Sequence, residues 1–475
     1  MKAKMSAFLE TSKPILKKLV NILKHDFKYV SILGTDTFGT SYRVSRNGTD
    51  INDSMWNERG FVVRVHNGVN YSEFSFNQLT EETLNSLVLK INTTLTSQKN
   101  ILKSTLPVNE YPLLKEEAIK RSYIGEVKIH PSQVNAKEKL NKMHLMLEKA
   151  LKSSTELVDF RISYNEIEIS KLFISSEKEL EQAYIISEGY LVPIVRRGEK
   201  TKINFKGHSG LKAVELLDEM ETSIDTVIKD AIELLDTEPI IPGEYDIICS
   251  PEITGLIVHE AFGHGVEMDM FLKNRAKAVE YLGKPVASPL ITMHDGGIAA
   301  KDVSSYLFDD EGTLATDTVI IKDGILQTGM SDLLSAMKLG TIPTGNGKRQ
   351  SFERKAYARM TNTFFTSGES TLEDMISSVS HGYLLEGMDS GMEDPKNWGI
   401  QCMLTKGREI KDGKFTGNIV SPVILTGYVP DLLGSISMVS NDFELFGCGA
   451  CGKGYKEYIK VSDGGPYIKA KARLG

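Results

Sequence analysis

The amino-acid sequence predicts an α+β protein, with N-terminal mixed α/β units that contain long helices and a strand-rich C-terminal domain. Two observations support this prediction. Before residue 237, segments with helical spacing of apolar residues are interleaved with strands of alternating polarity, whereas short hairpin signals dominate after it. The chain also has 475 residues, which is too long for one typical hydrophobic core, so we expect several domains.

The first expected domain, an α+β unit, spans residues 1–112. Residues 60–76 alternate in polarity and turn on Asn67-Gly68, a strong hairpin signal. A helix should follow, with Thr80 as its N-cap. Its apolar stripe is formed by Leu84, Leu87, Val88, Ile91 and Leu95.

The second expected domain, also α+β, spans residues 113–236. A helix near residues 134–154 has one apolar face, and residues 159–176 alternate as a strand does. Apolar residues then recur at helical spacing over residues 211–235, which predicts one long helix. Pro239, Pro242 and Gly243 end that pattern, so we place a boundary here.

The third expected domain, residues 237–475, is β-rich. It contains two further hairpin signals, Asp323-Gly324 in TVIIKDGILQTG and Asp412-Gly413 in MLTKGREIKDGKFTG. It also contains the segment that carries the chemistry. An apolar strand ends at Ser250, a candidate N-cap, and Pro251 stands at the first position of a predicted helix.

Composition excludes some classes of protein. The chain is 41% hydrophobic and 25% charged, which is ordinary for a soluble globular protein. Its net charge of −7 argues against nucleic acid as the main partner, because a strongly basic footprint is missing. No apolar run is long enough to cross a membrane, so we expect no membrane partner.

The N-terminus and the cysteines predict a cytoplasmic location. Residues 1–27 lack the uninterrupted apolar core of a signal peptide and have the pattern of an amphipathic helix. The chain contains only four cysteines, at positions 249, 402, 448 and 451. So few cysteines in so long a chain do not make a disulfide framework, which fits a reducing compartment.

The predicted helix after Pro251 carries His259, Glu260 and His264 in the run HEAFGH. Zinc peptidases often place two histidines at i and i+4, whereas here they stand at i and i+5. On a regular α-helix, residues at i and i+5 are about 140° apart, so both imidazoles cannot reach one ion. A π-turn, with its i→i+5 hydrogen bonds, would align them, and Gly263 and Gly265 would permit such a distortion.

Other interpretations of this motif stay open at this point. The histidines could be ordinary helix residues that cap or donate hydrogen bonds. A catalytic zinc usually has three protein ligands, so a third ligand is needed. Glu267 and Asp269 are close in sequence, and Cys448 and Cys451 stand in a glycine-rich segment near the C-terminus.

With these residues the sequence resembles the TldD/PmbA family of metallopeptidases, and within it the zinc-bearing TldD type. The resemblance is dense from about residue 240 to the end and looser around RGFVVRVHNG near the N-terminus. It rests on HEAFGHGVEMD, YLFDDEGTLATDTVIIKDGIL, TGNGKRQSF, RMTNTFFTSGESTLEDMI and GACGKG, which follow in the family's order and spacing.

The resemblance implies a bound Zn²⁺ held by His259, His264 and Cys451, which occupies the cysteine position of the family's G-x-C-G-K pattern. It implies that Glu260 is the catalytic acid/base, taking a proton from water and passing it to the leaving amine. Asn346 and Arg359 lie in family-like stretches and are candidates for binding the peptide backbone or a terminus.

The family also implies hydrolysis of short or unfolded peptides inside a closed dimer cavity. The dimer would be a homodimer or a heterodimer with a TldE/PmbA-like subunit, which lacks the zinc motif. The alternative is a non-catalytic binding or regulatory subunit in which zinc only staples the C-terminus. If Cys448 and Cys451 both held the metal, a closed structural site of this kind would be favoured.

Overall fold

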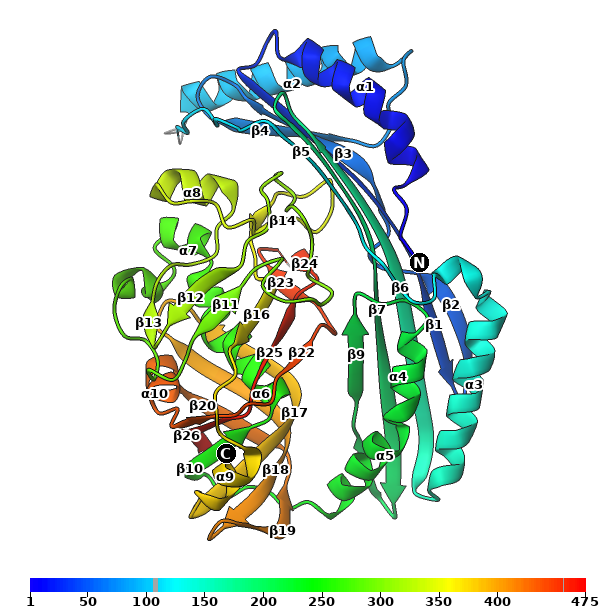
Figure 1. Ribbon diagram of the computed structural model, residues 1–475, viewed down its shortest axis with the longest axis vertical. Helices are drawn as coiled ribbons and strands as arrows, with labels where there is room; N and C mark the ends of the chain where they lie inside the picture. The colour runs from blue at the N-terminus through cyan, green and yellow to red at the C-terminus, as the bar shows by residue number, and fades with distance from the viewer. Residues whose placement is uncertain (106–109, 456) are drawn as a thin grey trace.

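The computed structural model describes residues 1–105, 110–455 and 457–475 and shows a mixed α+β architecture (Figure 1). A long curved sheet forms the N-terminal half, and its strands arch over a strand-rich C-terminal half. Within the described ranges, no helix is both long and apolar enough to cross a membrane.

The N-terminal sheet has nine strands and is mostly antiparallel, with the order β4-β3-β1-β6-β7-β5. Short strands β2, β8 and β9 pair with β1 or β7 at its margins. The strands are β1 Tyr29–Ser45, β2 Gly48–Asp53, β3 Glu58–His66, β4 Tyr71–Phe76, β5 Ile119–Ile124, β6 Leu157–Ile174, β7 Lys178–Arg197, β8 Lys200–Ile203 and β9 Lys206–Gly210.

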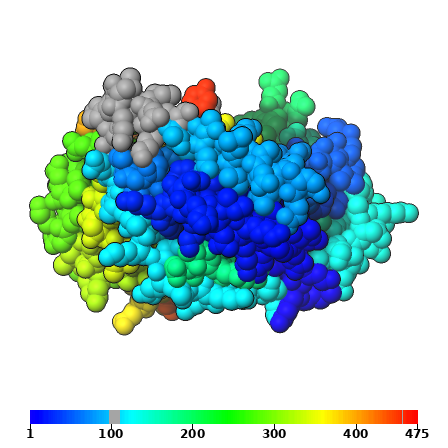
Figure 2. Space-filling model, turned by 90° about the horizontal axis from the view of Figure 1, so that it is seen from above, coloured from blue at the N-terminus to red at the C-terminus, as the bar shows by residue number. Residues whose placement is uncertain are grey.

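Helices cover this sheet in two groups, because each has one apolar face. The helices are α1 Ala7–Leu23, α2 Leu84–Thr105, α3 Ala136–Ser153, α4 Leu216–Thr222 and α5 Ile224–Glu233, with 3₁₀ turns at Pro131–Gln133 and Leu234–Asp236. Helices α1 and α2 pack on one end of the sheet and lie across the face seen in Figure 2. Helices α3, α4 and α5 bury a second apolar cluster against β1, β6 and β7.

Most of the N-terminal elements agree with the sequence-based expectations. The hairpin of β3 and β4, strand β6 and helix α3 are confirmed. Helix α2 begins at Leu84, so Thr80 is not its N-cap; it bonds with Thr83 in the turn before the helix. The single helix expected over residues 211–235 is also wrong. The structure has two helices here, α4 and α5, which are separated at Ser223. The N–H of Ser223 bonds to Met220 O, three residues back, so the turn is tighter than in an α-helix.

Five strands of the C-terminal half close into a barrel, in the order β10-β17-β18-β20-β26, because β26 also pairs with β10. Strand β19 extends this sheet from β18, and β21 extends it from β26. These strands are β10 Gly243–Cys249, β17 His381–Asp394, β18 Gly399–Lys411, β19 Lys414–Val420, β20 Val423–Tyr428, β21 Met438–Val439 and β26 Ile468–Leu474.

A six-stranded sheet with the order β13-β12-β11-β16-β25-β22 packs beside the barrel, and two small hairpins complete the strands. Both expected hairpins, β12–β13 and β18–β19, are confirmed. The strands are β11 Met293–Asp295, β12 Thr318–Lys322, β13 Ile325–Leu326, β14 Gly347–Lys348, β15 Tyr357–Ala358, β16 Asn362–Phe365, β22 Glu444–Phe446, β23 Cys451–Lys453, β24 Glu457–Ile459 and β25 Ser462–Gly465.

The helices of the C-terminal half are short. They are α6 Pro251–Leu256, a π-helical turn Ile257–Gly263, a 3₁₀ turn His264–Val266, α7 Met268–Leu272, a 3₁₀ turn Lys277–Tyr281, α8 Leu333–Leu339, α9 Leu372–Ser377 and α10 Val429–Gly434.

The N-terminal sheet takes strands from both of the units expected before residue 237. Strands β1 and β3 come from residues 1–112, and β6 and β7 from residues 113–236, yet they pair in one sheet. Apolar side chains of this sheet, among them Ile167 and Phe173, also pack against Tyr306 and Phe308 of the C-terminal half. The division into three domains remains a prediction.

Candidate metal centre

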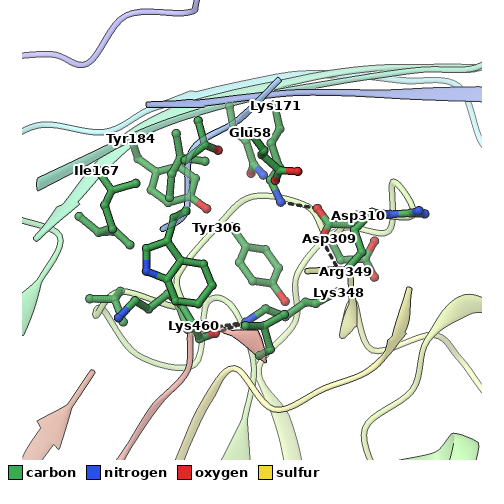
Figure 3. A pocket seen from close by; sticks show the side chains of 18 of the residues that line it. Glu58, Ile167, Lys171, Tyr184, Tyr306, Asp309, Asp310, Lys348, Arg349 and Lys460 are labelled. Carbon is green, nitrogen blue, oxygen red and sulfur yellow. Dashed lines mark hydrogen bonds and ion pairs between the residues drawn. The ribbon is translucent and has the colours of Figure 1, made fainter. Parts of the chain in front are cut away.

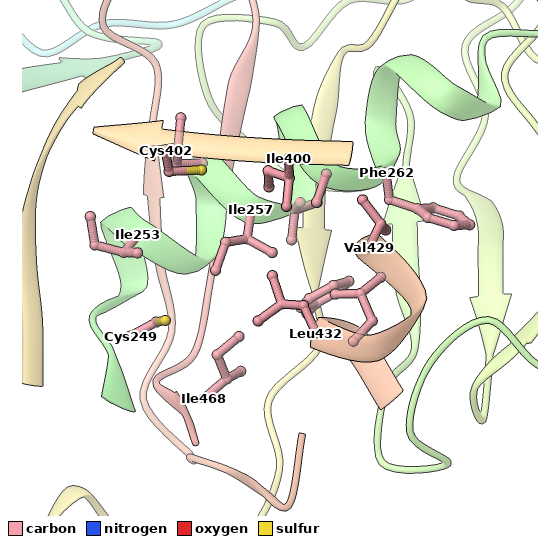
Figure 4. Packing of buried hydrophobic residues seen from close by; sticks show 14 of the residues in the cluster. Cys249, Ile253, Ile257, Phe262, Ile400, Cys402, Val429, Leu432 and Ile468 are labelled. Atoms are coloured by element: carbon pink, nitrogen blue, oxygen red, sulfur yellow. The ribbon is translucent and has the colours of Figure 1, made fainter. Parts of the chain in front are cut away.

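The segment that carries the two histidines starts from the barrel and runs through the C-terminal core. Strand β10 ends at Cys249, Ser250 takes an extended conformation, and Pro251 opens α6 as the sequence predicts, although the Ser250 side chain makes no capping bond. The apolar face of this segment packs into the largest hydrophobic cluster (Figure 4). The labelled members of the cluster are Cys249, Ile253, Ile257, Phe262, Ile400, Cys402, Val429, Leu432 and Ile468. The histidine segment is therefore anchored in the hydrophobic core of the C-terminal half.

The backbone from Ile257 to Gly263 is a π-helix, as the histidine spacing predicts. The N–H of His264 bonds to the carbonyl of His259, which is the i→i+5 pattern. A side chain at Gly263 would have its Cβ 2.2 Å from the sulfur of Met360, so a larger residue there would force Met360 to move. The wide turn brings the imidazoles of His259 and His264 to a centroid separation of 5.0 Å.

Cys451 supplies a third donor from far along the chain. It lies on β23, which pairs with β24. Its Sγ is 3.5 Å from His264 Nε2. Ligand atoms of His259, His264 and Cys451 all lie within 4.8 Å of one another, a spacing that one metal ion could bridge.

Each histidine turns its other ring nitrogen to a carboxylate. His264 Nδ1 is 3.3 Å from Glu267 Oε2, and His259 Nδ1 is 3.2 Å from Asp463 Oδ2. The Nε2 atoms are thus left to face the cysteine sulfur. Carboxylates behind imidazoles orient metal-binding histidines and raise their basicity, so this donor set fits a zinc ion.

Helix α6 packs closely against β25, and this close packing positions Asp463 of β25 next to the ring of His259. A Cβ on Gly255 would lie 2.8 Å from both Asp463 Oδ1 and Gly464 Cα. Because His259 is one turn further along the same helical face, the short contact at Gly255 brings the carboxylate against its ring.

The charges of the cluster favour the thiolate. Burial alone raises the pKa of the Cys451 thiol, but His259 and His264 lower that pKa well below its usual range. Burial alone lowers the pKa of His264, whereas Glu267 and Cys451 raise it to about 10. The two histidines therefore favour the thiolate form of Cys451, which is the form that binds metals.

Two buried cations connect β23 to the loop that follows the histidines. Lys453 lies 2.8 Å from Glu267 Oε2 and 2.6 Å from Asp269 Oδ1. Arg359 donates to Cys451 O at 2.7 Å and to Glu457 O at 3.2 Å. Glu267 and Asp269, considered above as ligands, instead take part in this support.

Asn346 and Arg359 are placed beneath the site. Asn346 is fully buried and donates to Asp295 Oδ1 at 2.6 Å and to Arg359 O at 2.9 Å. Arg359 is 1% exposed. The sequence predicts peptide contacts for both residues, and these contacts stay a prediction. In this structure the amide nitrogen of Asn346 and the two terminal nitrogens of Arg359 donate to acceptors within the protein.

Glu260 is adjacent to His259 but is not part of the ligand cluster. It is partly exposed, and its side chain lies against β17. A Cβ on Gly391 would lie 2.4 Å from Glu260 Cγ, so the glycine makes room for the carboxylate arm. The role of Glu260 in proton transfer stays a prediction.

Cys448 points away from the cluster. Its Sγ lies 3.2 Å from His208 O, close to Gly207 of β9. Burial raises the pKa of its thiol to about 12, so it stays protonated. Of the two C-terminal cysteines, Cys451 is therefore the one that belongs to the candidate metal centre.

A separate pocket lies between the N-terminal sheet and the C-terminal half (Figure 3), and none of the three potential ligands lines it. Trp56, Tyr184 and Tyr306 line it together with charged groups. These charged groups already have partners within the protein. Lys171 pairs with Asp310, and Lys348 donates to Ser304 Oγ and Lys460 O. The pocket is not part of the metal centre.

The sequence interpretation did not identify the supporting residues Asp463 and Lys453. Lys453 stands two residues after Cys451 in the glycine-rich pattern, so a search for polar residues beside the third ligand would have found it. No local signal marks Asp463, because the parallel pairing of β25 with β16 brings it to the site.

Comparisons with known proteins agree with this arrangement. Residues 242–473 match the family model described as the PmbA/TldA metallopeptidase C-terminal domain. A metalloprotease of Methanothermobacter thermautotrophicus is 30% identical over 318 residues, which cover 66% of this chain and 69% of that protein. A zinc metalloprotease TldD homolog of Saccharolobus solfataricus is 26% identical over 340 residues, covering 71% and 75% of the two chains.

The fold also has solved counterparts. TldE from Thermococcus kodakarensis superimposes with a TM-score of 0.74 and 17% identity, covering 97% of this chain and 99% of that one. At that identity the likeness shows the fold alone. The Methanothermobacter metalloprotease matches over more than two thirds of its own length, and the chain therefore belongs to the PmbA/TldD family of metallopeptidases.

Proposed function

We propose that this chain is a zinc-dependent peptidase in which His259, His264 and Cys451 hold the metal and Glu260 is the general base. One observation carries the proposal. Three potential ligand atoms lie within 4.8 Å of one another, and the carboxylate next to them in sequence stays outside the cluster. Three protein ligands leave one position for water or substrate, as catalytic zinc requires.

When bound, zinc would polarise the scissile carbonyl and make a bound water more acidic. The other parts of the mechanism belong to this chain. Glu260 would accept a proton from the attacking water and give it to the leaving amine. Its place against Gly391 limits where the carboxylate can go, and the π-helical turn fixes its direction relative to His259.

The substrate class and the assembly are parts of the same proposal. We infer that the substrates are short or unfolded peptides, cleaved in a cavity enclosed by two subunits. The family resemblance implies either a homodimer or a heterodimer with a TldE-like subunit, and we propose one of these two assemblies. The cytoplasmic location and the absence of a nucleic-acid partner remain expectations from composition.

The alternative, a non-catalytic subunit stapled by zinc, is less well supported. A closed structural site has four protein ligands. In the part of the chain that the structure describes, the candidate cluster has three, and Cys448 bonds elsewhere.

The substitution Glu260→Gln tests the proposal. We expect the variant to keep one zinc per chain and to lose peptide turnover by a factor of about 10²–10⁴, because it removes proton transfer and not coordination. Glu280→Gln, an exposed glutamate beyond the histidines, should match the wild type. Zinc analysis and a peptide-hydrolysis assay on the same preparations measure both effects. Undiminished turnover in the zinc-replete Glu260→Gln variant would contradict the assigned base.

A further inference from the structure

A second carboxyl group lies beside the metal centre and has no partner. Glu393 is near the end of β17, and both of its side-chain oxygens are shielded from solvent without a hydrogen bond. In the part of the chain that the structure describes, Glu393 is also not one of the residues that could hold the metal ion. A buried carboxylate without a partner is costly, so its presence here points to a ligand that supplies the missing donors.

The register of β17 places Glu393 along the histidine segment. Gly391 lies against Glu260, and Glu393, two residues further on, faces the same side of the strand. A Cβ on Gly265 would lie 3.9 Å from Glu393 Oε2. The carboxyl is therefore next to the 3₁₀ turn that begins at His264. The charged groups around it are His259 and His264, with Glu260 and Glu267.

An unpartnered donor lies at the same spot. Trp398 is completely buried, and its indole Nε1 has no acceptor. The Cβ position of Gly265 lies 3.5 Å from this nitrogen. An indole N–H can only donate, and an ionised carboxylate can only accept. The two groups together would suit a ligand that has both a donor group and a carbonyl oxygen.

We propose that Glu393 and Trp398 form a subsite for the free amino terminus of a peptide. The α-ammonium group would donate to Glu393, and the first carbonyl oxygen would accept from Trp398 Nε1. This inference rests on the proposed peptidase function. It makes the chain selective for peptides whose amino terminus is free and lies near the cleaved bond.

Charge supports an ammonium over a neutral donor. Among the described residues, neither oxygen of Glu393 has a hydrogen-bond partner, so no cation of the protein pairs directly with this carboxyl group. Glu267 already faces Lys453 at 2.8 Å, and Asp463 faces His259 at 3.2 Å. An ammonium group has three N–H donors and a positive charge, so it can satisfy both oxygens of Glu393.

Binding to a variant that cannot turn over its substrate tests this subsite. The zinc-loaded Glu260→Gln protein is titrated by calorimetry with tetraalanine and with N-acetyl-tetraalanine. We expect the free peptide to bind at least about tenfold more tightly, in keeping with a charge-assisted hydrogen bond. Adding Glu393→Gln should remove that preference by weakening the free peptide alone, with the zinc content unchanged.

Two further variants make the result specific. Asp389→Asn changes an exposed carboxylate on the same strand and should leave the preference intact. Trp398→Phe keeps an aromatic ring but removes the N–H, so it should weaken both peptides by a similar factor. A subsite for the amino terminus is excluded if Glu260→Gln binds the two peptides equally. It is also excluded if Glu393→Gln weakens both alike.

Failure of the proposed function would look different. If the wild-type protein hydrolyses no peptide but still prefers tetraalanine over its acetylated form, the peptidase proposal fails and the subsite stands. If the wild type hydrolyses both peptides with the same kcat/KM, the peptidase proposal stands and the subsite fails.

Discussion

At the scale of single residues, the proposed base depends on a glycine in the neighbouring strand. Gly391 has a backbone conformation open to any residue, since its φ is not in the left-handed region. The reason for glycine at this position is steric, because a Cβ would lie 2.4 Å from Glu260 Cγ and 2.9 Å from Leu256 Cδ1. The position thus controls where the carboxylate of Glu260 lies.

The substitution Gly391→Ala should therefore damage catalysis more than stability. We expect peptide turnover to fall by at least about tenfold, because small misplacements of a catalytic group have large effects on rate. Zinc content and the thermal midpoint should stay close to those of the wild type. Gly399→Ala, in the next strand, adds a methyl group with nothing within 4 Å and serves as the control. Equal activity of the two variants would show that Glu260 tolerates the displacement.

Individual residues differ in how far the sequence reveals them. The spacing predicts His259 and His264 as ligands, and the family resemblance implies Cys451 as the third ligand and Glu260 as the base. The structure brings His259, His264 and Cys451 together. Asp463 and Glu393 could not be found in this way, because strand pairing brings them to the site and their local sequence is ordinary. Arg359 donates to the carbonyl oxygen of Cys451, and its contact with a peptide stays a prediction.

At the scale of elements, the π-helical turn was predictable and the short strand β23 was not. Two histidines at i and i+5 can share one ion only on a widened turn, so their spacing alone requires the distortion. Strand β23 has only three residues and no alternating pattern, since tertiary contacts hold it. The break at Ser223 was missed for a related reason: the apolar residues continue through it and face one cluster.

The cysteine ligand should fix β23 to the histidine segment. We expect Cys451→Ser to lower the affinity for zinc by more than about 100-fold. Loss of a residue that only hydrogen-bonds to a metal ligand lowers the affinity by at most about that factor. Ligation energy also becomes folding energy, so residues 447–455 should become more sensitive to proteases. Zinc analysis and limited proteolysis followed by mass spectrometry measure both effects.

Cys448→Ser is the matched control, because its sulfur lies against β9 and not in the cluster. It should keep zinc, activity and protease resistance. If both cysteines prove necessary for zinc, the closed structural site becomes the better interpretation; if Cys448 alone is necessary, the ligand assignment must be exchanged.

At the scale of the whole molecule, buried ion pairs connect the N-terminal sheet to the C-terminal half. Arg64 and Glu73 face each other across β3 and β4 at 2.8 Å. Arg64 also lies 2.6 Å from Glu311, and Arg349 lies 2.9 Å from Glu73. Sequence patterns predict the hairpin that carries Arg64 and Glu73. They do not predict the ion pairs with Glu311 and Arg349, because these two residues stand far from the hairpin in the chain.

The substitution Arg349→Met tests how much these pairs stabilise the molecule. Breaking a buried pair should lower the free energy of unfolding by about 3–5 kcal/mol at pH 7. Burial alone raises the pKa of Glu73, but Arg349 and Arg64 lower it from 4.5 to about 2. A depressed carboxylate pKa stabilises the fold above pH 4.5, and this contribution is lost as the pH falls towards 2. The loss of stability in the Arg349→Met variant should therefore be smaller when urea unfolding is measured at pH 3 than at pH 7.

The control is Arg354→Met, at an exposed position nearby, which should change the free energy of unfolding by less than about 0.5 kcal/mol. A deficit of the same size at both pH values would mean that Arg349 acts by packing rather than by its charge.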